Sequence, residues 1–175
     1  MPALVEVVTL VRAAPAVLFD LELDVDVYAA SLAGSGETAS TPGGRRLLGP
    51  GDEVTFRARH LGVRWRMTSR VTAHQRPHRF VDEQVRGPFR SLHHEHLFED
   101  LGDGRTRMTD RMAVSALGGP LGALAVRLVL APYLRRLLRR RAGHVRALAE
   151  GGGGGPPPPP GLRPRPARPL GRRSR

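Results

Sequence analysis

The chain has 175 residues, a formal net charge of +12 and 40% hydrophobic residues, few of them aromatic. These values fit one globular domain with a largely aliphatic core, followed by a short remnant. The absence of cysteine excludes disulfides, thiolate nucleophiles, zinc–thiolate sites and iron–sulfur clusters. The start shows no signal-peptide pattern and no apolar stretch is long enough to span a bilayer, so we expect a cytoplasmic protein.

The last 25 residues differ in composition from the rest. The segment GGGGGPPPPPGLRPRPARPLGRRSR, residues 151–175, carries six arginines and no acidic residue. Runs of glycine and proline cannot build a packed core. We therefore divide the chain into a folded domain, residues 1–150, and a disordered tail, residues 151–175. The basic tail could adhere to nucleic acid or anionic lipid, and a low-complexity extension without such a role is the simpler interpretation.

The folded part begins with a β-branched strand at 4–12 and two short helices within 13–32. Pro15 suits the first turn of the first helix, and Asp24 can cap the second. From Gly34 onward the pattern changes to strands separated by turn residues. These predicted strands are 34–40, 53–61, 63–73, 79–85, 89–100 and 105–114, with hairpin turns near 86–88 and 101–104. The element order indicates an α+β fold.

A long helix is predicted from Gly118–Pro120 to about Glu150. An apolar stripe recurs at helical spacing, and arginines occupy the other faces. The stripe consists of Leu121, Leu124, Leu128, Ala131, Leu134, Leu138, Val145 and Leu148; the arginines are Arg135, Arg136, Arg139, Arg140, Arg141 and Arg146. Pro132 removes one backbone hydrogen bond and should kink the helix. We expect the stripe to pack on the sheet and the arginines to face water.

Strand alternation predicts which side chains share a face. Val54, Phe56, Ala58 and His60 form one apolar set, and Val63, Trp65, Met67 and Val71 form another. The arginines between them, such as Arg57 and Arg64, should cover the outer face of a one-sided sheet. The inner face should therefore be apolar in its first strands.

The segment FRSLHHEHLFED, residues 89–100, places His94 and His96 on the face that carries Leu92 and Phe98, and turns His93 and Glu95 away. If Phe98 pairs with Met108, His96 lies opposite Asp110; a turn centred on Pro88 places Asp82 opposite His94. The predicted polar cluster is Asp82, Gln84, His94, His96 and Asp110. Its predicted apolar surround is Phe56, Trp65, Met67, Phe98 and Met112.

Three interpretations of this cluster remain open. It can be a satisfied network of histidines and carboxylates in an ordinary core. It can be the polar part of a mostly apolar ligand pocket, which we favour. A zinc site made by His94, His96 and Asp110 is the third, but a His-x-His pair alone is a weak signal, and we expect neither a metal nor a cofactor.

Residues 3–149 resemble the SRPBCC superfamily of START-like, helix-grip proteins, and among these the polyketide cyclase/dehydrase-type ligand-binding proteins. The most specific segments are RGPF (86–89), the alternating L-x-H-x-H-x-F (92–98) and TRMTDRM (106–112). The resemblance implies a seven-stranded antiparallel sheet that grips the C-terminal helix around a deep cavity for a hydrophobic ligand. Activities vary across the superfamily, so fold does not fix function.

Three functions follow as hypotheses. The first is binding of a small hydrophobic molecule, polyketide-, quinone- or lipid-like, oriented by the polar cluster. The second is a cofactor-free cyclase or dehydratase that uses a His–Asp pair from His94, His96 and Asp110. The third is a carrier whose basic helix (133–141) and tail contact an anionic membrane. Sequence-specific nucleic-acid binding is not expected, because no recognition motif accompanies the arginines.

Overall fold

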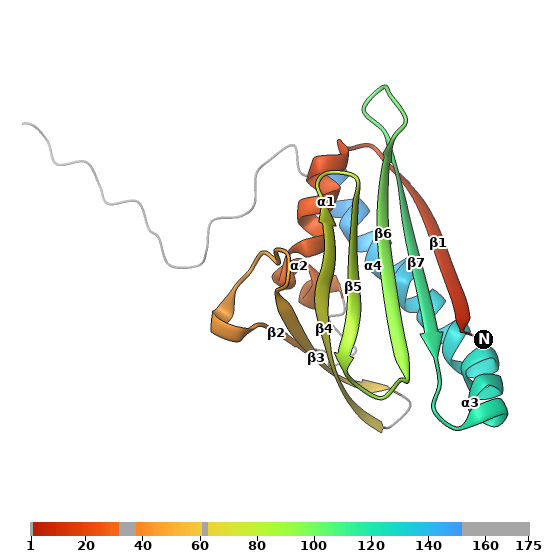
Figure 1. Ribbon diagram of the computed structural model, residues 1–175. Helices are drawn as coiled ribbons and strands as arrows, with labels where there is room; N and C mark the ends of the chain where they lie inside the picture. Colours follow the sequence, from red (N-terminus) through yellow and green to blue (C-terminus); the bar gives the residue numbers. More distant parts are fainter. Residues whose placement is uncertain (1, 32–37, 61–62, 152–175) are drawn as a thin grey trace, which may run out of the picture.

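The computed structural model describes residues 2–31, 38–60 and 63–151 and contains one antiparallel sheet with helices on one of its faces (Figure 1). The seven strands lie in the order β1-β7-β6-β5-β4-β3-β2. The elements are β1 (Ala3–Val11), α1 (Pro15–Leu23), α2 (Val25–Ser31), β2 (Thr38–Ser40), the 3-10 turn η1 (Pro42–Gly44), β3 (Glu53–His60), β4 (Val63–Gln75), β5 (Arg79–Arg86), β6 (Ser91–Asp100), β7 (Thr106–Ser115), α3 (Gly119–Ala125), the π-helical turn η2 (Val126–Leu130) and α4 (Ala131–Gly151). The predicted α+β architecture is confirmed.

The two short helices form where the sequence predicts them. Pro15 occupies the first turn of α1. Asp24 caps α2, since its Oδ1 accepts hydrogen bonds from the backbone N–H groups of Asp26 at 2.9 Å and Val27 at 3.2 Å. Of the predicted edge strand 34–40, the described residues 38–40 form β2; the predicted tail from 152 onward lies outside the described residues.

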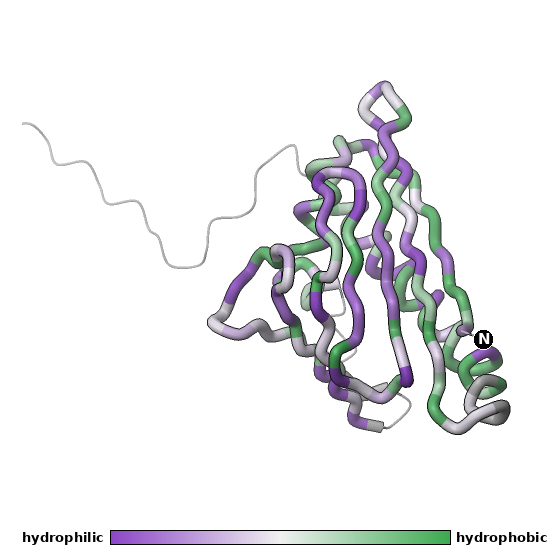
Figure 2. Tube along the Cα trace, viewed as in Figure 1, coloured by the Kyte–Doolittle hydropathy of each residue, from purple (hydrophilic) through white to green (hydrophobic). Residues whose placement is uncertain are grey.

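The sheet is one-sided, as strand alternation predicts. Along β6 the side chains of Leu92, His94, His96 and Phe98 are buried, and the residues between them are more exposed. Figure 2 shows that β6 is largely hydrophilic, because two of its buried positions are histidines. The arginines of β3 and β4 whose side chains are described, Arg57, Arg64, Arg66 and Arg70, are all exposed and face outward.

The long C-terminal helix carries an irregularity just before Pro132. The Ala131 N–H bonds the Val126 carbonyl five residues earlier, which makes η2 a π turn. In a regular α-helix the Pro132 ring would clash with the carbonyl of Leu128, and the wider π turn relieves that clash. The sequence predicts a kink here, and the structure accommodates the proline through a π turn.

The π turn also corrects the predicted apolar stripe. Leu134, Leu138, Ala142 and Val145 are buried against the sheet, whereas Leu124 and Leu128 are 52% and 65% exposed and Leu148 is 41% exposed. A π turn winds fewer degrees per residue than an α-helix, so a stripe counted at 3.6 residues per turn loses its phase across η2, which accounts for the exposure of Leu124 and Leu128. Leu148 lies after η2, in the last turn of α4. The side chain of Leu121 lies outside the described residues.

None of the helices in the described ranges combines the length and the hydropathy needed to cross a bilayer.

We expect Leu138→Ala to lower the free energy of unfolding by about 2–5 kcal/mol, because Leu138 is only 4% exposed and its loss leaves a cavity under α4. Leu128→Ala on the same helical segment is the matched control and should change stability by less than about 0.5 kcal/mol. Urea denaturation of both variants measures the difference. Equal losses would show that η2 packs on the sheet as α4 does.

Candidate functional site

Three neighbouring strands bring the predicted polar cluster together. Asp82 of β5 pairs with His94 of β6, and His96 of β6 pairs with Asp110 of β7. Phe98 pairs with Met108, so the register predicted from the turns is confirmed. Directly paired residues share one face of an antiparallel sheet. The two histidines therefore lie side by side, with a carboxylate on the strand to either side of them.

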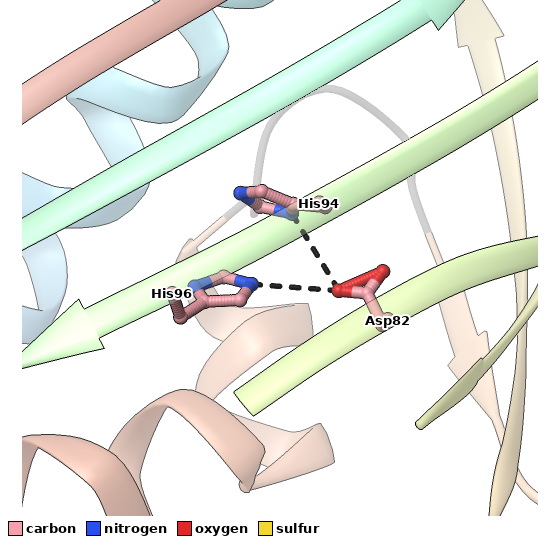
Figure 3. A group of neighbouring side chains, drawn as sticks. All are labelled: Asp82, His94 and His96. Carbon is pink, nitrogen blue, oxygen red and sulfur yellow. Dashed lines mark hydrogen bonds and ion pairs between the residues drawn. The ribbon is translucent and has the colours of Figure 1, made fainter. Parts of the chain in front are cut away.

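The two imidazoles are held between the two aspartates. Asp82 Oδ1 lies 3.6 Å from His94 Nδ1 and 3.4 Å from His96 Nε2 (Figure 3). Asp110 Oδ1 lies 3.5 Å from His94 Nε2 and 2.8 Å from His96 Nδ1. Each histidine therefore directs one ring nitrogen toward Asp82 and the other toward Asp110. We call these four residues the His–Asp cluster.

Burial of the polar groups in the His–Asp cluster costs folding free energy. His94, His96 and Asp110 are 3%, 0% and 2% exposed, and only Asp82 retains some contact with solvent. His94 Nε2, His96 Nδ1 and Asp110 Oδ1 have no well-aligned hydrogen-bond partner among the described residues. A buried polar atom without such a partner costs about 1–3 kcal/mol. The contacts around Asp110 are therefore mainly electrostatic.

Two further residues complete the site and were missed by sequence reasoning. Glu22 at the end of α1 and Arg141 of α4 lie 2.5 Å apart, Oε2 to Nη2. Arg141 also donates a hydrogen bond to the Glu22 carbonyl at 2.8 Å, and its guanidinium lies 4.5 Å from the centre of the Tyr28 ring. Glu22 Oε2 is 3.9 Å from His96 Nδ1, which links this pair to the His–Asp cluster.

The position of Arg141 corrects the expectation that the helix arginines face water. Its side chain is only 12% exposed. The signal was present in the helical spacing, because Arg141 follows Leu134 by seven residues and Leu138 by three, which places it on the buried face. The run of neighbouring arginines concealed that spacing. No comparable signal marks Glu22, whose partner is more than a hundred residues away in the sequence.

The cluster assigns different protonation states to its two histidines. Burial alone would lower the pKa of His96, but its contacts with Asp110 and Asp82 outweigh burial and raise that pKa to about 9. Burial and the neighbouring His96 lower the pKa of His94. At neutral pH, His96 is therefore an imidazolium and His94 a neutral imidazole.

The carboxylates respond to the same surroundings. Burial disfavours charge on Asp82 and Asp110, yet the contacts from His96 and His94 hold the pKa of both below the ordinary range. Burial raises the pKa of Glu22 above its ordinary value, and the charge of Arg141 opposes that rise. Asp82 and Asp110 are thus ionised and balanced by His96 and Arg141, which leaves Glu22 as the most readily protonated carboxyl group.

A small pocket lies beside the cluster, between the two short helices, α4 and strands β3–β5. Its cavity volume is about 30 Å³, and Glu22, Tyr28, Phe56, Asp82 and Arg141 line it together with aliphatic side chains. That volume holds about two water molecules. Phe56 and Asp82, both predicted as ligand-binding residues, therefore meet at one pocket.

Gln84 does not join the cluster as the sequence predicts. Its side-chain amide donates a hydrogen bond to the Phe89 carbonyl at 2.8 Å and accepts one from the Phe89 N–H at 3.3 Å. These bonds fix the turn between β5 and β6. The reason is the turn itself, since residues 87–90 leave backbone groups that a nearby amide can satisfy.

The remaining predicted apolar residues divide between core and rim. Phe98 and Met112 are buried in two separate hydrophobic clusters. Trp65 is half-buried and stacks on Phe89 with ring centres 5.8 Å apart, and Met67 packs against the second cluster. The side chains of Ala58, His60 and Val63, placed on the same face by the sequence, lie outside the described ones.

Two sets of side chains within the site have the spacing of metal ligands. Asp82, His94 and His96 form one set, and Glu22, His96 and Asp110 form the other; within each set the ligand atoms lie within 4.8 Å of one another. Fewer side chains of the HHEH run (93–96) converge on the site than its composition suggests, as predicted, because His93 faces outward and pairs with Glu83 at 2.9 Å.

In metal-free protein we expect His96 to lose its proton near pH 9 and His94 to be neutral at pH 7. Folding raises the pKa of His96 above 6.5, so its stabilisation is fully present below that pH and is lost as pH rises through about 9. The slope is at most about 1.4 kcal/mol per pH unit. Imidazole nitrogen NMR shifts, followed from about pH 5 to about pH 10, measure both titrations. A midpoint for His96 near that of a free imidazole would contradict the pairing.

Solved structures share this architecture at low sequence identity. An aromatase/cyclase from Streptomyces sp. R1128 is 19% identical, with a TM-score of 0.68 over 88% of this chain and 99% of that one. The protein TTHA0849 from Thermus thermophilus is 18% identical, with a TM-score of 0.67 over 84% and 99%. A major latex-like protein from Panax ginseng is 12% identical, with a TM-score of 0.64 over 85% and 97%. At these identities the likeness shows the fold alone.

A comparison with curated proteins gave no significant match. The profile of the family described as polyketide cyclase/dehydrase and lipid transport, in contrast, matches residues 2–150. This range takes in every strand and all but the last residue of the final helix. The protein thus belongs to the polyketide cyclase/dehydrase and lipid transport family, which confirms the resemblance to the SRPBCC superfamily.

Proposed function

We propose that the protein binds a small, largely apolar molecule that carries a carbonyl or hydroxyl group, of the polyketide, quinone or lipid class. Membership of the family implies a cavity for a hydrophobic ligand, and the proposal adds the polar end of that ligand. The observation that carries it is the His–Asp cluster, buried on the inner face of the sheet beside a pocket. Mostly apolar pockets with a few convergent polar groups are typical of small-molecule sites.

The polar residues would orient the ligand. His96 as an imidazolium can donate a hydrogen bond to a carbonyl oxygen, and neutral His94 can accept one from a hydroxyl group. Tyr28 and Phe56, with ring centres 4.4 Å apart, supply aromatic walls. Burial of the ligand's apolar surface supplies affinity at roughly 25 cal/mol per Å², and the polar contacts supply the choice between ligands.

Ligand entry requires side chains to move. A typical small-molecule site has a volume of about 300–1,000 Å³, whereas the pocket beside the cluster measures about 30 Å³. Separation of Tyr28 from Phe56 would open this pocket between α2 and β3. Arg141 helps to hold Tyr28 in place, because its guanidinium lies over the ring.

We expect a polyhydroxylated anthraquinone to raise the melting temperature of the full chain more than anthracene, a hydrocarbon of similar shape. At a free concentration of 100 times Kd the stabilisation amounts to about 2.7 kcal/mol. Asp82→Asn should weaken quinone binding by about ten-fold, or about 1.4 kcal/mol, because it disturbs the histidines that meet the carbonyl. Differential scanning fluorimetry and fluorescence titration measure both effects.

Glu95→Gln is the control, since Glu95 lies on the outer face and pairs with Arg79 at 2.6 Å. This variant should bind the quinone as the wild type does. Equal stabilisation by quinone and hydrocarbon, or loss of binding in Glu95→Gln, would contradict the proposed polar recognition.

A catalytic function is the second candidate, and the unequal protonation of the two histidines favours it. A neutral imidazole and an imidazolium, with ring centres 3.9 Å apart, provide a base and an acid at one carbonyl. Cyclisation or dehydration of a poly-β-ketone needs this combination. The reaction would require no cofactor.

We expect Asp110→Asn to lower kcat for a poly-β-ketone analogue by about 10²–10⁴-fold, because the acid–base pair loses its positioning carboxylate. Binding should weaken by no more than about ten-fold. His96→Ala should lower kcat similarly, with binding weakened but retained, because the apolar contacts of the ligand remain. Turnover measured by product chromatography, with binding measured on the same samples, separates the two functions. Turnover that persists in both variants excludes the His–Asp mechanism.

Contact with an anionic membrane stays a prediction. The helix arginines Arg135, Arg136, Arg139 and Arg140 are exposed, but Arg141 is engaged by Glu22. The expectation also includes membrane contact by the basic tail, which lies outside the described residues.

A further inference from the structure

We propose that Asp82, His94 and His96 bind a divalent transition-metal ion, with zinc as the best fit, and that Asp110 supports the two histidines from behind. The site departs from the expectation that no metal would bind. It is independent of the identity of the hydrophobic ligand.

The ligand atoms have nearly the separations that a tetrahedral ion requires. Bonds of about 2.0–2.2 Å to nitrogen and oxygen place neighbouring ligand atoms roughly 3.3–3.6 Å apart. Asp82 Oδ1 lies 3.4 Å from His96 Nε2 and 3.6 Å from His94 Nδ1, and each of the three residues offers a ligand atom within 4.8 Å of the others. Figure 3 shows both ring nitrogens directed at the Asp82 carboxylate. Small side-chain rotations would make room for the ion between them.

The backbone positions these ligands rigidly. His94 and His96 project from the same face of β6, and Asp82 is the direct partner of His94 on β5. Sites built on paired strands hold their geometry better than sites on loops.

Asp110 occupies the position of an outer-shell partner for both histidines. Its Oδ1 contacts His94 Nε2 at 3.5 Å and His96 Nδ1 at 2.8 Å, the nitrogens that face away from Asp82. Histidines that bind metals usually donate their other N–H to such a carboxylate, which fixes the tautomer and orients the ring. In this arrangement the lone pairs of His94 Nδ1 and His96 Nε2 face Asp82. Ring rotation upon metal binding would align the now poorly aligned contacts to Asp110.

The buried carboxylates also favour a bound cation whenever both histidines are neutral. Glu22, Asp82 and Asp110 contribute three negative charges when ionised, and Arg141 contributes one positive charge. With both histidines neutral, as metal binding demands, the site carries a charge of −2, which one divalent ion neutralises. Uncompensated buried charge is costly, so protons must take this role in the metal-free protein.

The donor set selects among metals. Two imidazoles and one carboxylate suit zinc and its neighbours, whereas magnesium and calcium prefer oxygen ligands alone. Asp82 lines the small pocket and retains partial exposure. The fourth position of the ion would therefore face this pocket and accept water or an oxygen of a bound molecule.

The test uses the full chain, treated with a chelator and dialysed, then titrated with Zn²⁺ by calorimetry and with Co²⁺ by visible absorption. We expect one site per chain, the intense absorption of tetrahedral Co²⁺, and no comparable binding of Mg²⁺. His94→Gln and Asp82→Asn should weaken Zn²⁺ binding by more than about 100-fold, and Asp110→Asn by roughly 10–100-fold.

His93→Gln is the matched control, because His93 lies on the same strand but faces outward, 46% exposed. Its affinity for Zn²⁺ should equal that of the wild type. Absence of Co²⁺ absorption in the wild type, or binding that survives Asp82→Asn and is lost in His93→Gln, overturns the proposal. Should His94→Gln fail to fold, Asp82→Asn decides, because it preserves the shape of a partly exposed side chain.

The quinone titration repeated in chelator separates this inference from the proposed function. Quinone binding that persists without metal, together with no Zn²⁺ site, overturns the metal site alone. If the protein binds Zn²⁺ but no apolar ligand, the metal site is supported and the proposed ligand-binding function is overturned.

Discussion

The constraint on which the rest of the structure depends is the burial of two histidines between two aspartates on the inner face of the sheet. Transfer of one such charge into the interior costs several kcal/mol unless an opposite charge accompanies it. The antiparallel register supplies that partner for each group, since Asp82 lies opposite His94 and Asp110 opposite His96. The pairing of β5, β6 and β7 is therefore fixed by electrostatics as well as by hydrophobic alternation.

The helical layer extends this constraint to the other side of the core. Arg141 reaches from α4 to Glu22 at the end of α1 and covers the polar cluster. The π turn before Pro132 contributes, because it sets the rotation at which α4 enters the interface and leaves Leu128 outside. A charged contact between helices and sheet thus replaces part of the aliphatic packing that the sequence led us to expect.

The same groups that stabilise the interior can also take part in binding and in acid–base chemistry. A neutral imidazole, an imidazolium and ionised carboxylates within one cluster can orient a carbonyl, transfer a proton or bind a metal ion. Proteins of this architecture share their fold with this chain at 12–19% identity, and fold alone does not select among such functions. The side chains that face the cavity make that selection.

The sequence by itself determined the element order, the one-sided sheet and the pairing of the His–Asp cluster, because strand alternation and short turns depend on neighbouring residues. The tertiary structure alone decided the role of Glu22, the pairing of Arg141 with it and the use of Gln84 at a turn. These contacts depend on how helices and loops far apart in the chain meet, and on a π turn that changes helical phase. Local periodicity carries no information about such long-range contacts or about the π turn. The His–Asp cluster on the sheet therefore followed from the sequence, whereas the Glu22–Arg141 pair contributed by the helices did not.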